Sequence, residues 1–164
     1  MDRLTFAQIL VKNYYGNPAN FDEIVQFFVA VMTGEGSKAW FNPLDTEFQL
    51  AYTLNYNSAG VKNYLTIYDG YKATVGTLAL PYYDGLNAKI KDSTSSALDM
   101  ALEFSTTPWG YIGDRLPAEI VQDFNRGSLS YVTERRGLIG MPPANYFGIN
   151  SSCEFLPALE SLVK

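Results

Sequence analysis

The sequence predicts a mainly α-helical domain with a small irregular or β lobe and a C-terminal extension. Apolar residues recur at helical spacing in several segments, and turn-forming residues gather between 40 and 65 and again after 127. The chain has 164 residues, of which 47% are hydrophobic, so it is long enough for one domain with a core. We therefore expect a single globular unit, in which residues 111–164 pack as an extension on a domain formed by residues 1–110.

Composition excludes several classes of function. The formal net charge is −5 and no stripe of Lys and Arg exists, which disfavours a nucleic-acid partner. The chain has no histidine, so Ser-His and Cys-His nucleophiles and most zinc sites are excluded, and Cys153 has no second cysteine for an intrachain disulfide. We also find no membrane-spanning stretch and no signal peptide, and we predict neither a metal nor a cofactor.

Two helices are expected at the start of the chain. The apolar spacing from Leu4 to Tyr15 predicts the first helix, with Asp2 as its N-cap. Asn20 begins the second, and Glu23 lies three residues later, as in a capping box. This second helix is apolar nearly all round, so we predict that it is the central buried helix and that it ends at Gly34.

A polar lobe with little regular structure is expected from 40 to 65. Residues 48–50 and 60–64 are candidates for short strands. Helices resume at Thr66, where Asp69 three residues later is typical of a second capping box, and Pro81 either ends or kinks that helix.

Further helices are expected in the rest of the chain. We predict a short helix over 83–91 and then another that is capped by Ser93 or Thr94. Pro117 suits the first turn of a helix that runs to about Asn125. Residues 127–150 are expected to form an extended loop, and 154–163 a terminal helix.

Glu35 is the most informative residue for function. It stands between Gly34 and Gly36, at the end of the predicted central helix. The last carbonyl groups of a helix are unpaired and carry partial negative charge, so a nearby carboxylate is repelled and its neutral form is favoured. A carboxylic acid that keeps its proton near neutral pH is suited to general acid catalysis. The alternative interpretation is a loop carboxylate that its two glycines expose to solvent.

Several motifs together resemble a known family. They are Glu35-Gly36, the run Phe41-Asn42-Pro43-Leu44-x-Thr46, the segment Asn55-Tyr56-Asn57-Ser58-x-Gly60-Val61-Lys62-Asn63-Tyr64, Gly70-x-x-Ala73-Thr74-x-x-Thr77-Leu78, and Pro108-Trp109-Gly110. Between about residues 24 and 110 the chain is similar to lysozyme-like peptidoglycan-degrading domains of bacteriophage and actinobacterial proteins. The resemblance implies a two-lobed helical lysozyme-like fold with a cleft, in which Glu35 is the catalytic acid. Asp45 departs from the pattern, because such sequences usually have Asn there.

The second catalytic group is less well defined by the sequence. Asp45 and Glu47 lie on the polar lobe, where a nucleophile or a water-activating base would face Glu35, and we take Asp45 as the candidate. Taken singly, each carboxylate is also explained as a turn or surface charge. If neither faces the cleft, a lytic transglycosylase needs no second carboxylate, because one acid then serves in turn as acid and base.

Six residues are candidates for contact with a glycan. They are Trp40, Asn42, Asn55, Asn57, Asn63 and Tyr64. Amide groups offer a donor and an acceptor together, which suits the acetamido and hydroxyl groups of amino sugars, and an indole ring stacks on a sugar face. The alternatives are Asx turns for Asn55 and Asn57 and core packing for Trp40.

These observations support one main hypothesis and two alternatives. The first is an enzyme, a muramidase or lytic transglycosylase whose substrate is the glycan strand of peptidoglycan. It would act at the bacterial cell wall or as part of a virion, with other virion proteins as partners. The second is a non-catalytic structural or interaction protein of a virion on a lysozyme-like scaffold. The third is a host-directed inhibitor that binds through a Tyr-rich surface.

Overall fold

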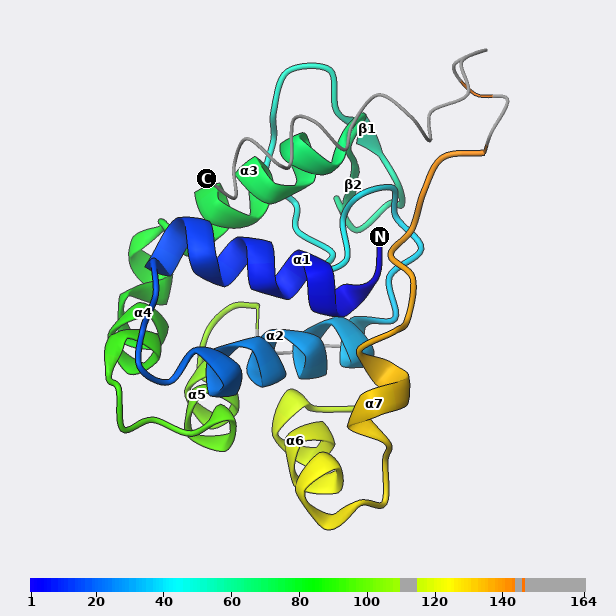
Figure 1. The fold of residues 1–164 in the computed structure, drawn as a ribbon. Coiled ribbons are helices and arrows are strands. Elements are labelled where there is room, and N and C mark those ends of the chain that lie inside the picture. The colour runs from blue at the N-terminus through cyan, green and yellow to red at the C-terminus, as the bar shows by residue number, and fades with distance from the viewer. Residues whose placement is uncertain (110–114, 144–145, 147–164) are drawn as a thin grey trace.

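The computed structural model describes residues 1–109, 115–143 and 146, and within them it shows a mainly helical fold with one small sheet (Figure 1). The helices are α1 (Arg3–Leu10), α2 (Phe21–Glu35), α3 (Ile67–Leu78), α4 (Asp84–Lys91), α5 (Ala97–Phe104), α6 (Pro117–Arg126) and α7 (Tyr131–Glu134). The π-helical turn η1 (Val11–Tyr15) continues α1, and the 3-10 turn η2 (Pro81–Tyr83) precedes α4. Strands β1 (Leu54–Asn55) and β2 (Lys62–Asn63) pair antiparallel. The predicted mainly helical class with a small β lobe is confirmed, whereas Cys153 and the predicted helix over 154–163 lie outside the described residues.

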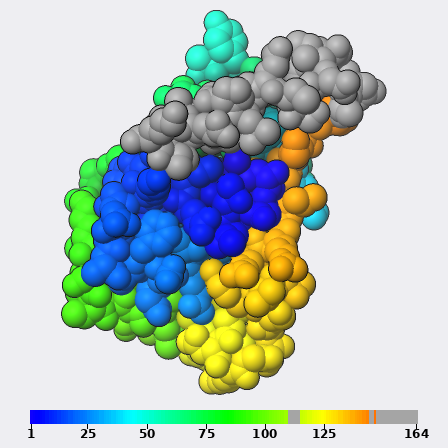
Figure 2. Space-filling view, viewed as in Figure 1, coloured from blue at the N-terminus to red at the C-terminus, as the bar shows by residue number. Residues whose placement is uncertain are grey.

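Helix α2 is the centre of the fold, as its apolar composition predicts. Its residues from Ile24 to Met32 are buried except for Gln26. The helix packs against α1, α5 and α6. Figure 1 shows α1 and α6 on opposite sides of α2, and Figure 2 shows α1 and α2 side by side on the same face of the molecule. Helix α6 belongs to the predicted C-terminal extension, so this part of the extension shares one core with the first hundred residues.

The C-terminal end of α2 differs from the prediction by one residue, and the difference concerns the candidate acid. The helix does not end at Gly34 but continues through Glu35. Gly36 then adopts a left-handed conformation, with φ 54°, and its N–H donates to the Met32 carbonyl oxygen at 3.2 Å. Glu35 is therefore held in the last helical turn and is not part of a free loop.

Several helix caps follow the sequence signals closely. The Asp2 carboxylate accepts a hydrogen bond from the Thr5 N–H at 2.8 Å and caps α1 as predicted. The Thr66 hydroxyl oxygen accepts one from the Asp69 N–H at 3.1 Å and caps α3. Pro117 occupies the first turn of α6, where its missing N–H is not needed.

The capping box predicted for α2 is wrong. The Asn20 side chain makes no cap bond, and its Nδ2 instead donates to the carbonyl oxygens of Asp92 at 3.0 Å and Ser95 at 3.3 Å. The Glu23 carboxylate accepts from the Ala97 N–H at 2.7 Å, so it caps the first turn of α5 and not of its own helix. A tertiary contact has replaced the local one, because packing places the N-terminus of α5 beside the first turn of α2.

The cap of α5 also lies later than predicted. Ser96, and neither Ser93 nor Thr94, is the N-cap, and it forms a full capping box with Asp99. The loop before it continues two residues further because Ser95 is buried there beside α2.

Loss of the Glu23 cap should measurably destabilise the fold. We expect Glu23→Ala to lower the free energy of unfolding by about 1 kcal/mol, because the Ala97 N–H loses a charge-assisted partner. Asp22→Ala is the matched control, since Asp22 lies in the same first turn of α2 and has the same interaction with the helix dipole. Urea denaturation of the two variants measures the difference, and equal losses would contradict a specific cap.

The small lobe between α2 and α3 contains the hairpin of β1 and β2. Strand β2 falls inside the predicted segment 60–64, but β1 lies at 54–55 and not at 48–50. The turn explains the shift. The Asn57 side-chain oxygen accepts from the N–H groups of Ala59 at 3.1 Å and Val61 at 3.2 Å, and the strands therefore flank this turn directly.

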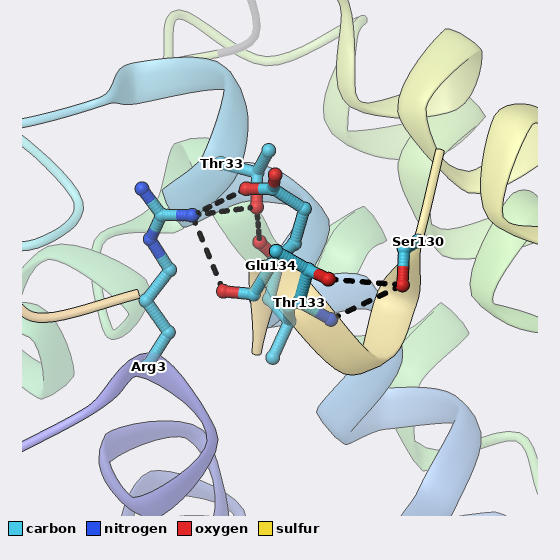
Figure 3. A network of polar contacts seen from close by, with 6 residues as sticks. Arg3, Thr33, Ser130, Thr133 and Glu134 are labelled. Atoms are coloured by element: carbon cyan, nitrogen blue, oxygen red, sulfur yellow. Dashed lines mark hydrogen bonds and ion pairs between the residues drawn. The ribbon is translucent and has the colours of Figure 1, made fainter. Parts of the chain in front are cut away.

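A polar network joins three helices near the end of α2 (Figure 3). The Arg3 Nη1 of α1 donates to the Thr33 hydroxyl of α2 at 3.2 Å and forms an ion pair with the Glu134 carboxylate of α7 at 2.8 Å. The same nitrogen donates to the Glu134 carbonyl oxygen at 3.3 Å. The network thus fixes α1 and α7 to the last turns of α2, two residues before Glu35.

Candidate active site

The carboxyl group of Glu35 is held in an environment that disfavours its charged form. Glu35 is half-buried, and no residue in the described part of the chain donates a hydrogen bond to its carboxyl group. Burial is the main cause that raises its pKa to about 8, and the negative charge of Asp45 adds to the shift. Both causes point in the direction that the sequence argument predicts. Glu35 therefore carries its proton at neutral pH.

Asp45 is the carboxylate next to Glu35, and its surroundings are more polar. Burial raises its pKa, but a hydrogen bond from the Ser37 hydroxyl acts against that increase by stabilising the anion. Its backbone is in the left-handed region, with φ 51°, which Asp and Asn tolerate better than most residues. The charge of Asp45 acts on the Glu35 carboxyl group, so the two predicted catalytic residues lie within electrostatic range of each other.

The raised pKa of Glu35 makes stability depend on pH. The folded protein keeps this proton up to about pH 8, whereas the unfolded chain releases it near 4.5. The folded state thus binds more protons between these values, and the free energy of unfolding falls as pH rises through them. We expect Glu35→Gln to remove this fall, with a stabilisation of about 2 kcal/mol above pH 8 after allowance for partial exposure.

Urea denaturation of wild type and Glu35→Gln across this pH range measures the effect. The difference between the two proteins should vanish below about pH 4, where both states are protonated, and increase with pH above it. A difference that stays constant with pH would contradict the raised pKa.

Asn42 holds the loop that carries Asp45. Its side chain is fully buried, its Nδ2 donates to the carbonyl oxygens of Thr46 at 2.8 Å and Lys62 at 2.7 Å, and its Oδ1 accepts from the Thr46 N–H at 2.9 Å. Both donor hydrogens of the amide and its carbonyl oxygen are thus used within the chain. We therefore correct the predicted glycan contact of Asn42 to a structural role that positions Asp45.

Three other predicted glycan-binding residues stabilise the same loop. The Asn63 Oδ1 is buried and accepts from the Trp40 N–H at 2.7 Å. The Tyr64 ring is fully buried, and its hydroxyl donates to the Phe48 carbonyl oxygen at 2.7 Å. Asn63 and Tyr64 are thus part of the scaffold. The Trp40 ring is half-buried and packs edge-on against Tyr146, with 4.5 Å between ring centroids.

Asn55 and Asn57 lie exposed on the hairpin. The Asn55 side-chain oxygen accepts from the Lys62 Nζ at 2.7 Å, and Asn57 forms the turn described above. The Asx-turn alternative therefore explains Asn57. Neither side chain forms a hydrogen bond with Glu35 or Asp45.

A pocket of about 320 Å³ lies beside Asp45. Its walls include Glu47 and three aromatic side chains, Phe48, Tyr83 and Trp109. Glu35 does not line this pocket, and Asp45 is the wall residue whose charge acts on the Glu35 carboxyl group. The volume is in the range that accommodates small ligands.

Sequence reasoning missed Ser37 and the pocket. Ser37 shows no pattern that connects it to Asp45, because the loop geometry alone places them together. Tyr83 and Trp109 follow the spacing of core residues, and they do pack edge to face with 5.8 Å between ring centroids. The available signal was that Trp109 lies in the motif that closes the resembling segment.

Two further findings limit the chemistry of the described part of the chain. No group of three or more His, Cys, Asp or Glu side chains is placed there to hold a metal ion. None of the helices seen there combines the length and apolar character that crossing a bilayer requires.

Comparison of the chain with protein-family models, curated proteins and solved structures finds no match. The functional argument therefore depends on the site itself.

Proposed function

We propose that the protein cleaves the glycan strands of peptidoglycan, as a muramidase or a lytic transglycosylase with Glu35 as general acid. The single observation that carries the proposal is the carboxyl pair, in which Glu35 keeps its proton at neutral pH beside Asp45. A carboxyl group that keeps its proton near a second carboxyl group is the arrangement that most glycoside hydrolases use, and the protonated group alone is sufficient for a lytic transglycosylase. The sequence resemblance supports peptidoglycan as the substrate and a virion or the bacterial cell wall as the place of action.

In the proposed reaction Glu35 donates its proton to the oxygen of the leaving sugar as the glycosidic bond breaks. Positive charge then develops on the ring of the other sugar, and the carboxylate of Asp45 is suited to stabilise it electrostatically. Glu35, now a carboxylate, recovers a proton from an attacking water in hydrolysis or from the sugar's own hydroxyl in transglycosylation. The Ser37 hydroxyl and the Asn42 amide fix Asp45 and its loop for this role.

The test is treatment of purified cell walls with the wild-type protein, followed by mass spectrometry of the soluble products. We expect the turbidity of the suspension to fall and glycan fragments to appear. Reducing ends would identify a hydrolase, and anhydro ends a transglycosylase. If no fragment is released at any pH from about 5 to 8, the range in which Glu35 keeps its proton, the non-catalytic virion protein becomes the better explanation.

Asp45→Asn should change the pH dependence of this activity. Asn keeps the hydrogen bond to Ser37 and tolerates the positive φ, but it removes the charge that raises the pKa of Glu35. We expect the alkaline limb of the pH–rate profile, where Glu35 loses its proton, to move to lower pH. An unchanged alkaline limb would show that Asp45 does not act on the acid.

A further inference from the structure

The pocket beside Asp45 is rich in negative charge and in aromatic surface. Asp45 and Glu47 are its two carboxylates, and Phe48, Tyr83 and Trp109 provide rings on its walls. In the part of the chain that the structure describes, every ion pair lies elsewhere and no Lys or Arg neutralises either carboxylate. Two uncompensated carboxylates in a concave site create a potential that attracts a cation.

The pocket also has few hydrogen-bond donors to offer. The hydroxyls of Thr46 and Thr77 bond to each other, and Thr77 also donates to the Ala73 carbonyl oxygen at 3.0 Å. The Trp109 Nε1–H donates to the Leu44 carbonyl oxygen at 2.9 Å, so the indole offers its ring to the pocket and has no free N–H to donate. A neutral sugar needs donors and acceptors in similar numbers, whereas this pocket presents mostly acceptors.

Tyr83 is the polar residue of the pocket wall whose hydroxyl has no hydrogen-bond partner among the described residues. The residue as a whole is only 5% exposed, but its hydroxyl oxygen keeps some contact with solvent. Glu47 lines the same pocket, and burial together with the charge of Glu47 raises the pKa of Tyr83. A hydroxyl in this position is available to a ligand or to water.

We propose that this pocket binds a primary ammonium group at the end of an alkyl chain. The carboxylates of Asp45 and Glu47 would accept hydrogen bonds from the ammonium, the Tyr83 oxygen would accept a third, and the aromatic faces would contact the methylene groups and the charge. The identity of the ligand rests on the proposed function: it is the free side-chain amine of a diamino acid in the stem peptide of peptidoglycan. The protein would then favour strands whose stem peptides are not cross-linked through this amine.

The binding test uses two small probes that differ only in charge. Nα-acetyl-lysine amide carries the free amine, and Nα,Nε-diacetyl-lysine amide does not. We expect NMR titration to show binding of the first probe at the Trp109 indole resonance and at least about tenfold weaker binding of the second. Equal affinities for the two probes, or no perturbation by either, would overturn the proposal.

Variants then localise the probe. Glu47→Gln should weaken binding of the free-amine probe about fivefold, whereas Glu119→Gln, an exposed carboxylate on α6 outside the pocket, should leave it unchanged. Tyr83→Phe gives a second measure at the pocket hydroxyl and should also weaken binding. Thermal unfolding confirms that each variant is folded, and a Glu47→Gln protein that binds as well as the Glu119→Gln control would overturn the proposal.

Cell-wall assays separate this inference from the proposed function. Native and amine-acetylated cell walls are compared for binding to Glu35→Gln and for cleavage by the wild type. Amine-dependent binding of the probe and of the walls without any cleavage would support the pocket and reject the glycan-cleaving function. Cleavage of both kinds of wall at equal rates, with no amine-dependent binding, would reject the pocket and leave the function intact.

Discussion

Glu35→Gln is expected to reduce the rate of cell-wall lysis by at least about a hundredfold, because the amide keeps the shape of the side chain but has no proton to donate. The substitution should not unfold the protein. Glu35 is half-buried without a hydrogen-bond donor to its carboxyl group in the described residues, and Gln is stabilising near neutral pH because the chain no longer has to bind a proton on folding. Turbidity loss and release of soluble glycan fragments measure the rate, and a thermal melt measures stability.

The matched control for this experiment is Glu119→Gln. Glu119 is also a helical glutamate, but it is exposed on α6 and does not contact the carboxyl pair. We expect this variant to lyse cell walls at the wild-type rate. If Glu35→Gln lysed them equally well, Glu35 would not be the acid, and the catalytic assignment would fail even if the wild type were active.

Gly70→Ala is expected to destabilise the fold by about 3 kcal/mol and to lower the melting temperature by about 10 °C. Gly70 lies in the first turn of α3, where the helix meets the backbone of Phe41 directly. A Cβ at this position would overlap the Phe41 carbonyl oxygen and lie 2.9 Å from its carbonyl carbon. Phe41 cannot easily retreat, because its φ is 52° and its N–H is bonded to the Gly140 carbonyl oxygen at 2.8 Å.

Gly85→Ala provides the comparison for the second prediction. Gly85 is also helical, but an added Cβ would meet only the flexible end of the Glu103 side chain. The gain in helix propensity should then offset this contact, and we expect stability to change by less than about 1 kcal/mol. A Gly70→Ala protein as stable as Gly85→Ala would contradict the close approach of α3 to the loop. Because that loop carries Asp45, we also expect Gly70→Ala to lower activity.

Local signals in the sequence were sufficient for most of the helices. The apolar character of α2 predicts its burial, and Asp2, Thr66 and Pro117 mark helix starts correctly because their partners lie within a few residues. Glu23 has the same local signature, yet it caps α5. Its partner lies 74 residues away, and nothing in the neighbouring sequence specifies such a contact.

The same limit applies to the candidate site: residues with local signals could be predicted, and residues whose role depends on distant contacts could not. Glu35 is found from its place at the end of an apolar helix, and Asp45 from its place on the polar lobe. Asn42 and Asn63 were expected to face the glycan because their amides suit it, but both amides are used to hold the loop. Residue type states which hydrogen bonds a side chain can make, and only the folded loop decides whether solvent or backbone receives them.

The link between Arg3 and Glu134 has a consequence for the order of events in protein synthesis. These two residues are 131 positions apart, and together they anchor the turn that precedes the acid. A nascent chain has Glu35 early, but it has no anchor for this turn until Glu134 has left the ribosome. Glu35 therefore reaches its final surroundings only after translation has passed that point.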